Sequence, residues 1–326
     1  MTFKQNWEKT DPTLYPSVEL INKMINKAFS TKKIYSCKLI SGGCANLNYK
    51  VYFVLESTPY ILRLYLRDSE AVYREQQLSL LLKPKLPIPE VYFIGHYQGF
   101  QFALIECLSG ITLRDLLLSK QNFDMAYLMY KLGTLAAQIH AYLFPSAGFF
   151  NRRLQIIQSP KSSYSEYGKE CLENEWVIAT LDLKIRSKIA FYLNYLDKFF
   201  PSTDEKCLVH GDFDPANILV TEENKQWKIS AILDWEFAFS GSPLFDVANM
   251  LRYAHYMPAS FKNSFLKGLS LSYTLPAHWQ TTVNLLNLLS LLDCLTRSSA
   301  NHPNQQADIY QLITYIINQF DKEYAL

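Results

Sequence analysis

Residues 210–220 read HGDFDPANILV. This stretch places the carboxylate of Asp212 five residues before the carboxamide of Asn217, in a loop that directly precedes an apolar run. Pro215 and the polar residues around it keep the loop out of helical conformation. For any one of these residues alone, the simpler interpretation is a side chain that caps a loop. The complete set in this order is hard to obtain by chance.

The segment after this loop predicts a β-hairpin. Residues 227–234 read WKISAILD, an apolar strand that ends at Asp234, and the polar turn TEENKQ separates it from the strand that begins at Ile218. Such a hairpin brings Asn217 and Asp234 to the same end of adjacent strands. Their hard oxygen atoms suit Mg2+, which takes few protein ligands and completes its shell with phosphates and water. Asp212 would then orient an acceptor hydroxyl and accept its proton.

The first third of the chain is predicted to combine strands with helices. Residues 60–66, YILRLYL, form an apolar strand with one central cation, Arg63. The helix expected over 69–83 carries Glu75 inside its apolar face, where an unpaired carboxylate is costly. We therefore expect an Arg63–Glu75 ion pair, with a purely structural role as the alternative. The other elements expected here are a helix over 17–29 and strands over 34–40, 48–55, 91–96 and 101–106.

Beyond a boundary near 106–111, the chain is predicted to be mostly helical. The expected helices span 112–119, 124–143, 165–178, 181–199, 244–256, 258–270, 276–297 and 304–322. The fold class is therefore α+β. We expect a β-rich N-terminal lobe with one key helix over 1–106, and a C-terminal lobe over 107–326 that carries the catalytic hairpin.

Composition limits the possible function classes. The chain has 326 residues, of which 49% are apolar and 19% charged, as in globular proteins. A net charge of +2, with no run of five like charges, argues against a nucleic-acid or membrane-surface partner. The first residues, MTFKQNWEKTDPTLYP, do not resemble a signal peptide, and no apolar run reaches the roughly 20 residues of a membrane span. The six cysteines are scattered without ligand spacing, so a cytoplasmic location is expected.

HGDFDPANILV, followed by AILDWEFAFSGSPLFDVANMLR at 231–252, closely resembles the catalytic core of the aminoglycoside phosphotransferase and choline kinase-like family. This resemblance implies a bilobal protein-kinase-like fold, ATP as phosphoryl donor and Mg2+ as cofactor. It implies Asp212 as catalytic base, with Asn217 and Asp234 as metal ligands. It also implies that Arg63 and Glu75 position the α- and β-phosphates of the nucleotide.

The same resemblance assigns two nucleotide-binding segments in the N-terminal third. The loop around Ser41, Gly42, Gly43 and Asn46 is similar to the family's phosphate-covering loop, although a glycine pair between strands is often only a turn. FALIECLSG at 102–110 is similar to the hinge between the lobes. There the backbone groups of Glu106 and Leu108 would pair with the adenine edge, and an ordinary strand followed by a turn is the alternative.

Two further residues are assigned supporting roles. Asp246 lies at the start of a predicted helix, where the helix dipole favours a carboxylate, and the resemblance implies that it also braces the catalytic loop. His210 is expected to shape that loop and not to act as a base.

The acceptor is expected to be a small molecule with a hydroxyl group. Acidic and aromatic residues would suit a cationic acceptor, through charge pairing and cation–π contact, although solvated helix faces and core aromatics explain them equally well. The candidates are Asp214, Tyr164, Tyr167, Glu170, Glu173, Glu175, Trp176 and Glu236.

Several activities remain compatible with this pattern. An aminoglycoside-type phosphotransferase leads, and choline, ethanolamine, homoserine, methylthioribose or another sugar are alternative acceptors. A non-catalytic nucleotide-binding protein is an alternative of a different class, which the intact set of charged residues disfavours. The missing His-Arg-Asp, Asp-Phe-Gly and Ala-Pro-Glu motifs disfavour a protein kinase.

Overall fold

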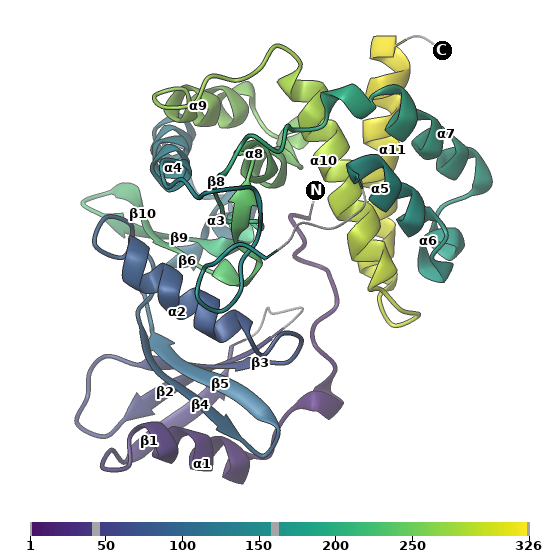
Figure 1. The fold of residues 1–326 in the computed structure, drawn as a ribbon. Coiled ribbons are helices and arrows are strands. Elements are labelled where there is room, and N and C mark those ends of the chain that lie inside the picture. Colours follow the sequence, from purple (N-terminus) through teal and green to yellow (C-terminus); the bar gives the residue numbers. More distant parts are fainter. Residues whose placement is uncertain (1, 41–45, 158–162, 325–326) are drawn as a thin grey trace.

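The computed structural model describes residues 2–40, 46–157 and 163–324, which form two lobes (Figure 1). The N-terminal lobe is built on a five-stranded antiparallel sheet with the strand order β1-β2-β3-β5-β4. Its strands are β1 (Ile34–Leu39), β2 (Leu47–Phe53), β3 (Tyr60–Tyr65), β4 (Val91–Tyr97) and β5 (Phe100–Glu106). Two helices, α1 (Val18–Ala28) and α2 (Ala71–Leu82), pack against this sheet.

The alternation of side chains along β3 decides what faces α2. Leu62 and Leu64 are fully buried in a cluster that includes Met24 of α1. Because successive residues of a strand point to opposite faces, Arg63 and Tyr65 lie on the other side of the sheet. There Tyr65 packs in a small cluster with the start of α2. The strand pattern thus presents one cation to the helix that carries a buried carboxylate.

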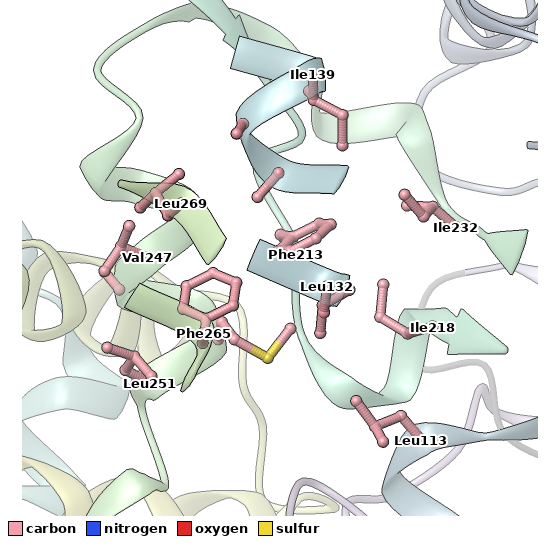
Figure 2. Close-up of a cluster of buried hydrophobic side chains, with 14 of the residues drawn as sticks. Leu113, Leu132, Ile139, Phe213, Ile218, Ile232, Val247, Leu251, Phe265 and Leu269 are labelled. Carbon is pink, nitrogen blue, oxygen red and sulfur yellow. The ribbon is translucent and has the colours of Figure 1, made fainter. Parts of the chain in front are cut away.

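The C-terminal lobe is mostly helical and contains two large hydrophobic clusters. Its helices are α3 (Leu113–Leu118), α4 (Met125–His140), α5 (Tyr164–Leu172), α6 (Glu175–Thr180), α7 (Leu183–Tyr195), α8 (Leu244–Leu251), α9 (Ala259–Leu269), α10 (Trp279–Thr296) and α11 (Pro303–Tyr324). Figure 2 shows the cluster in which α4, α8 and α9 meet the predicted hairpin. Within the described ranges, no helix is long and apolar enough to cross a membrane.

The predicted hairpin is present. Strands β9 (Ile218–Glu223) and β10 (Gln226–Ile232) pair antiparallel, with Ile218 opposite Ile232. The two turn residues between them, Asn224 and Lys225, both have positive φ, as a tight two-residue hairpin turn requires. A short strand, β6 (Ile111–Thr112), adds to the outer side of β9.

The structure differs from the sequence prediction mainly where helices end. The helix predicted over 165–178 is two helices, because the Asn174 side chain accepts a hydrogen bond from the backbone of Trp176 and starts α6 anew. The helix predicted over 244–256 ends at Leu251 and is followed by a separate 3-10 turn. Four short strands were not predicted. One is β6, and the other three, β7 (Gly148–Phe149), β8 (Cys207–Val209) and β11 (Phe239–Gly241), form a small sheet. Strands this short carry too few residues for a periodic signal.

Helices α4 and α9 cross at two glycines. A Cβ atom on Gly133 would lie 2.0 Å from the carbonyl oxygen of Phe265, and one on Gly268 would lie 2.1 Å from that of Tyr130. These contacts are to backbone atoms, which cannot rotate away. The close approach of the two helices therefore depends on glycine at both positions, because glycine has no side chain.

We expect Gly133→Ala to push α4 and α9 apart and to lower the free energy of unfolding by about 1–3 kcal/mol, as for other overpacked cores. Chemical denaturation followed by circular dichroism measures this change. Lys131→Ala, an exposed substitution on the same helix, is the matched control and should stay within about 0.5 kcal/mol. Equal denaturation midpoints for Gly133→Ala and the control would contradict the close helix contact.

Candidate active site

Asp246 at the start of α8 fixes the backbone of the loop that precedes β9. Its Oδ2 accepts a hydrogen bond from the backbone N–H of His210 at 2.9 Å, and its Oδ1 accepts one from Gly211 at 3.0 Å. The His140 ring contacts the same carboxylate at 2.9 Å. Asp246 is almost fully buried, so these contacts replace its hydration. The expected brace of the loop is present.

The loop is also held by packing on both sides of Asp212. Gly211 has φ +83°, and a Cβ there would lie 2.3 Å from the carbonyl oxygen of Phe237. The Phe213 side chain is fully buried and, as Figure 2 shows, points into the core near Leu132 and Phe265. Asp212 is therefore set between two anchored neighbours.

His210 ties this loop to the end of β10. The backbone N–H of Asp212 donates to His210 Nδ1 at 3.2 Å, so Nδ1 is an acceptor and the ring proton lies on Nε2. Nε2 then donates to the carbonyl oxygen of Leu233 at 2.8 Å. The backbone N–H of Leu233 donates to the carbonyl oxygen of Asn217 at 2.8 Å. Through these bonds, Asn217 lies beside Leu233. Asp234, which follows Leu233, therefore lies at the same end of the hairpin as Asn217.

Asn217 orients Asp212 directly. Its Nδ2 donates to the backbone oxygen of Asp212 at 2.9 Å and to the carboxylate oxygen Oδ2 at 2.8 Å. Asp234 has a left-handed backbone conformation, with φ 69° and ψ 60°, which is uncommon for a residue other than glycine. Such strain is often stored at functional sites. The hydrogen bonds from Asn217 to Asp212 and from Leu233 to Asn217 thus place Asp212, Asn217 and Asp234 near the same end of the hairpin.

The predicted Arg63–Glu75 pair is present within a larger ion cluster that spans both lobes. The Arg63 guanidinium lies 3.4 Å from Glu75 of α2 and 3.4 Å from Glu236, and it forms an ion pair with Asp234. Its side chain is only 6% exposed. The Tyr65 hydroxyl donates a hydrogen bond to Glu75. The two C-terminal-lobe partners of Arg63, Asp234 and Glu236, were not predicted as such.

Asn46 joins this cluster from the end of the predicted phosphate loop. Its Nδ2 donates to Glu236 Oε2 at 2.9 Å, and its Oδ1 accepts from the backbone N–H of Leu66 at 3.2 Å. The other residues predicted for that loop, Ser41, Gly42 and Gly43, lie outside the described residues. Asn46 therefore contacts Glu236, one of the carboxylates that surround Arg63.

The cluster holds more carboxylates than cations. Arg63 supplies one positive charge against the carboxylates of Glu75, Asp234 and Glu236. Burial raises the pKa of Glu236 to about 7, and Asp234 and Glu75 add to this rise while Arg63 opposes it. Burial likewise raises the pKa of Glu75. An additional cation beside Asp234 would relieve this imbalance.

Asn217 and Asp234 have the donor atoms that Mg2+ prefers. The amide hydrogens of Asn217 are used on Asp212, and the remaining polar atom of its side chain is the acceptor oxygen Oδ1. The described part of the chain has no group of three or more His, Cys, Asp or Glu side chains that could hold a metal ion. A site of one carboxylate and one carboxamide would therefore need phosphate oxygens and water to complete its coordination.

Sequence reasoning missed Lys4. Its Nζ lies 3.0 Å from Asp212 Oδ1, and it also forms an ion pair with Asp214. Such a contact between residues more than 200 positions apart leaves no periodic signal in the sequence. Asp214 was predicted as part of the acceptor wall, and its charge is instead paired within the chain.

The predicted hinge residues lie at the end of β5 and in the segment that follows it. The backbone N–H of Glu106 donates to the carbonyl oxygen of Glu90, and its carboxylate forms an ion pair with Lys83. Leu108 lies in the irregular segment between β5 and β6. Their predicted contacts with adenine stay predictions.

This site lies between a β-rich and a helical lobe, the arrangement of protein-kinase-like phosphotransferases. A model of the phosphotransferase enzyme family matches residues 36–281, so the chain belongs to this family. One solved relative is aminoglycoside phosphotransferase APH(4)-Ia in ternary complex with AMP-PNP and hygromycin B, with 19% identity, a TM-score of 0.67, and 91% of this chain and 97% of that chain covered. Another is wild-type aminoglycoside 2'-phosphotransferase-IIIa with GDP, with 16% identity, a TM-score of 0.70, and coverage of 92% and 98%. At these sequence identities, the likeness to the solved structures shows the fold alone.

A curated relative is acyl-CoA dehydrogenase family member 11 of Mus musculus. It is 42% identical over 65 residues, which cover 20% of this chain and 8% of the relative. The chain thus matches only a small part of the length of this larger protein.

We expect Asp246→Ala to lower the free energy of unfolding by about 2–5 kcal/mol, because it leaves two buried backbone N–H groups without an acceptor. It should also accelerate hydrogen exchange at the amides of His210 and Gly211. Urea denaturation and exchange measured by NMR test both effects. Glu222→Ala, which removes an exposed carboxylate on β9, is the control. Unchanged exchange at the two amides would contradict the brace.

Proposed function

We propose that this phosphotransferase-family chain transfers the γ-phosphoryl group of ATP to a hydroxyl group of a small molecule, with Asp212 as catalytic base. The observation that carries this proposal is the convergence of Asp212, Asn217 and Asp234 at one end of the hairpin, opposite Arg63 from the other lobe. Family membership supports the reaction class.

Each residue has a role that its contacts support. Asp212 would align the acceptor hydroxyl and accept its proton. Asn217 orients the Asp212 carboxylate through one hydrogen bond to Oδ2 and holds the Asp212 backbone through a second hydrogen bond to its carbonyl oxygen. Arg63, held by Glu75 and Glu236, would contact the phosphates of the nucleotide. Asn217 and Asp234 would hold Mg2+, which when bound neutralises phosphate charge.

The donor is assigned as ATP, and the solved relatives include complexes with an ATP analogue and with GDP, so GTP is the second donor to test. The proposed location is the cytoplasm. The five cysteines that the structure describes are all unpaired, as expected in a reducing compartment.

The test of this proposal is ADP release from Mg-ATP across aminoglycosides, macrolides, amino alcohols and sugars. Release that depends on one acceptor class would support the proposal and identify that class. An amino-alcohol or sugar kinase would be recognised by the same assay. ATP binding without release for any acceptor would favour the non-catalytic alternative, and absence of ATP binding would remove the nucleotide site.

We expect Asp212→Ala to lower the turnover number by about 10²–10⁴-fold, because the acceptor hydroxyl loses its base. Mg-ATP affinity should stay within a few-fold, since Asp212 faces the acceptor and not the nucleotide. Single-turnover ADP release and calorimetric nucleotide titration measure the two effects separately. Normal turnover in Asp212→Ala would contradict the assigned base.

We expect Asp234→Ala to weaken Mg-ATP binding as well as turnover, because one of the two proposed metal ligands is lost. Nucleotide affinity measured against magnesium concentration should lose most of its dependence on the ion. Glu222→Ala again serves as the control. A magnesium dependence identical to that of the unmodified protein would place the metal elsewhere.

A further inference from the structure

The N-terminal segment 2–8 runs along the C-terminal lobe beside the catalytic loop. Phe3 is 2% exposed and lies against Tyr253, with ring centroids 5.0 Å apart. Its ring centroid is 6.5 Å from that of Phe261 in α9. Trp7 is likewise buried, in the second hydrophobic cluster of this lobe. Two large apolar side chains therefore anchor the segment on either side of Lys4.

Polar contacts to α11 fix the same segment. The Asp308 Oδ2 atom accepts hydrogen bonds from Thr2 at 3.0 Å, from Trp7 Nε1 at 2.8 Å and from the Tyr253 hydroxyl at 2.5 Å. Glu8 accepts hydrogen bonds from the first backbone N–H groups of α11, at 2.8 and 3.1 Å. Lys4 is therefore held in a segment with contacts before and after it.

The backbone turns at Lys4 so that its side chain reaches the catalytic loop. Phe3 and Lys4 both have positive φ, 44° and 63°. The ammonium group lies 3.0 Å from Asp212 Oδ1, forms an ion pair with Asp214, and lies 5.7 Å from the centre of the Trp7 ring. The Lys4 side chain is 16% exposed and that of Asp214 6%.

The charge on Lys4 is stabilised at this place. Burial by itself would lower the pKa of Lys4, but Asp212 and Asp214 outweigh this effect and raise it, so the side chain stays protonated. Asp214 has a further partner, because its Oδ1 accepts a hydrogen bond from the backbone of Ala216 at 2.7 Å. The carboxylates of Asp212 and Asp214 are thus both paired with the ammonium group of Lys4.

We propose that Lys4 is a specificity-determining residue of the acceptor site, a resident cation that favours neutral or anionic acceptors over those with an amine next to the reactive hydroxyl. This inference rests on the proposed function for the identity of the acceptor site. A cationic acceptor would approach a fixed ammonium group and find both Asp212 and Asp214 already paired. Like-charge contacts of this kind are how binding sites reject a wrong partner.

One other acidic residue predicted for the acceptor wall, Glu236, is also paired within the chain, because it belongs to the Arg63 cluster. Asp214 and Glu236 are thus engaged by Lys4 and by Arg63, respectively.

The test uses spermidine as a polycationic probe, titrated calorimetrically into the full chain without nucleotide. Lys4→Met should bind spermidine at least tenfold more tightly than the unmodified protein, because Asp212 and Asp214 lose their partner. Lys9→Met, which removes an exposed charge directly after this segment, is the matched control and should match the unmodified protein. Adding Asp214→Asn to Lys4→Met should reduce the gain, because only Asp212 then remains as an unpaired carboxylate.

Equal spermidine affinities for Lys4→Met and the control, with both melting cooperatively, would overturn the inference. If Lys4→Met does not fold, Lys4→Gln replaces it, since an amide can still donate to Asp212. Lys4→Arg keeps the charge and should bind spermidine as the unmodified protein does.

This measurement needs no phosphoryl transfer, so it separates the two proposals. Absence of ADP release would overturn the proposed function, whereas equal spermidine affinities would overturn the role of Lys4 alone.

Discussion

The arrangement of the proposed active site depends on one buried guanidinium. Arg63 comes from the central strand of the N-terminal sheet and contacts carboxylates of both lobes: Glu75 on α2, and Asp234 and Glu236 after the catalytic hairpin. A charge at this depth is tolerated only when it is paired, so moving one lobe away from the other would expose uncompensated charge on both. The position of the N-terminal lobe is therefore coupled, through Arg63, to Asp234, which is proposed to bind the metal.

The loop that carries Asp212, the proposed catalytic base, is held by a second buried group. Asp246 fixes the backbone before Asp212, while His210 links the same loop to the end of β10. Asn217 then orients the Asp212 carboxylate from within the loop. Catalytic groups held in this way lose little entropy when a substrate arrives, which is the physical advantage of a preorganised site. The proposed acceptor side differs, because the negative charges of Asp212 and Asp214 are balanced by Lys4 from the N-terminal segment.

Local sequence predicted the parts of the site whose residues are close together in the chain. The hairpin and the position of Asn217 and Asp234 at the same end of it followed from apolar strands separated by a polar turn, because strand pairing across a short turn is a local event. The Arg63–Glu75 pair followed from a different argument, namely that a carboxylate on an apolar helix face needs a partner. The two-lobed α+β fold was also predicted, partly through its resemblance to a known family.

Tertiary structure alone decided which distant charges meet. Glu236 was placed in the acceptor wall from its type and is instead a partner of Arg63 and Asn46, since the lobes close on each other there. Lys4 lies more than 200 residues from Asp212, and neither periodicity nor motif spacing links them. The sequence by itself determined the elements, the hairpin and the chemistry of its residues, because these depend on neighbours along the chain. The charge balance of the site was determined only by folding, because electrostatic interactions act through space between side chains whose distances the sequence does not contain.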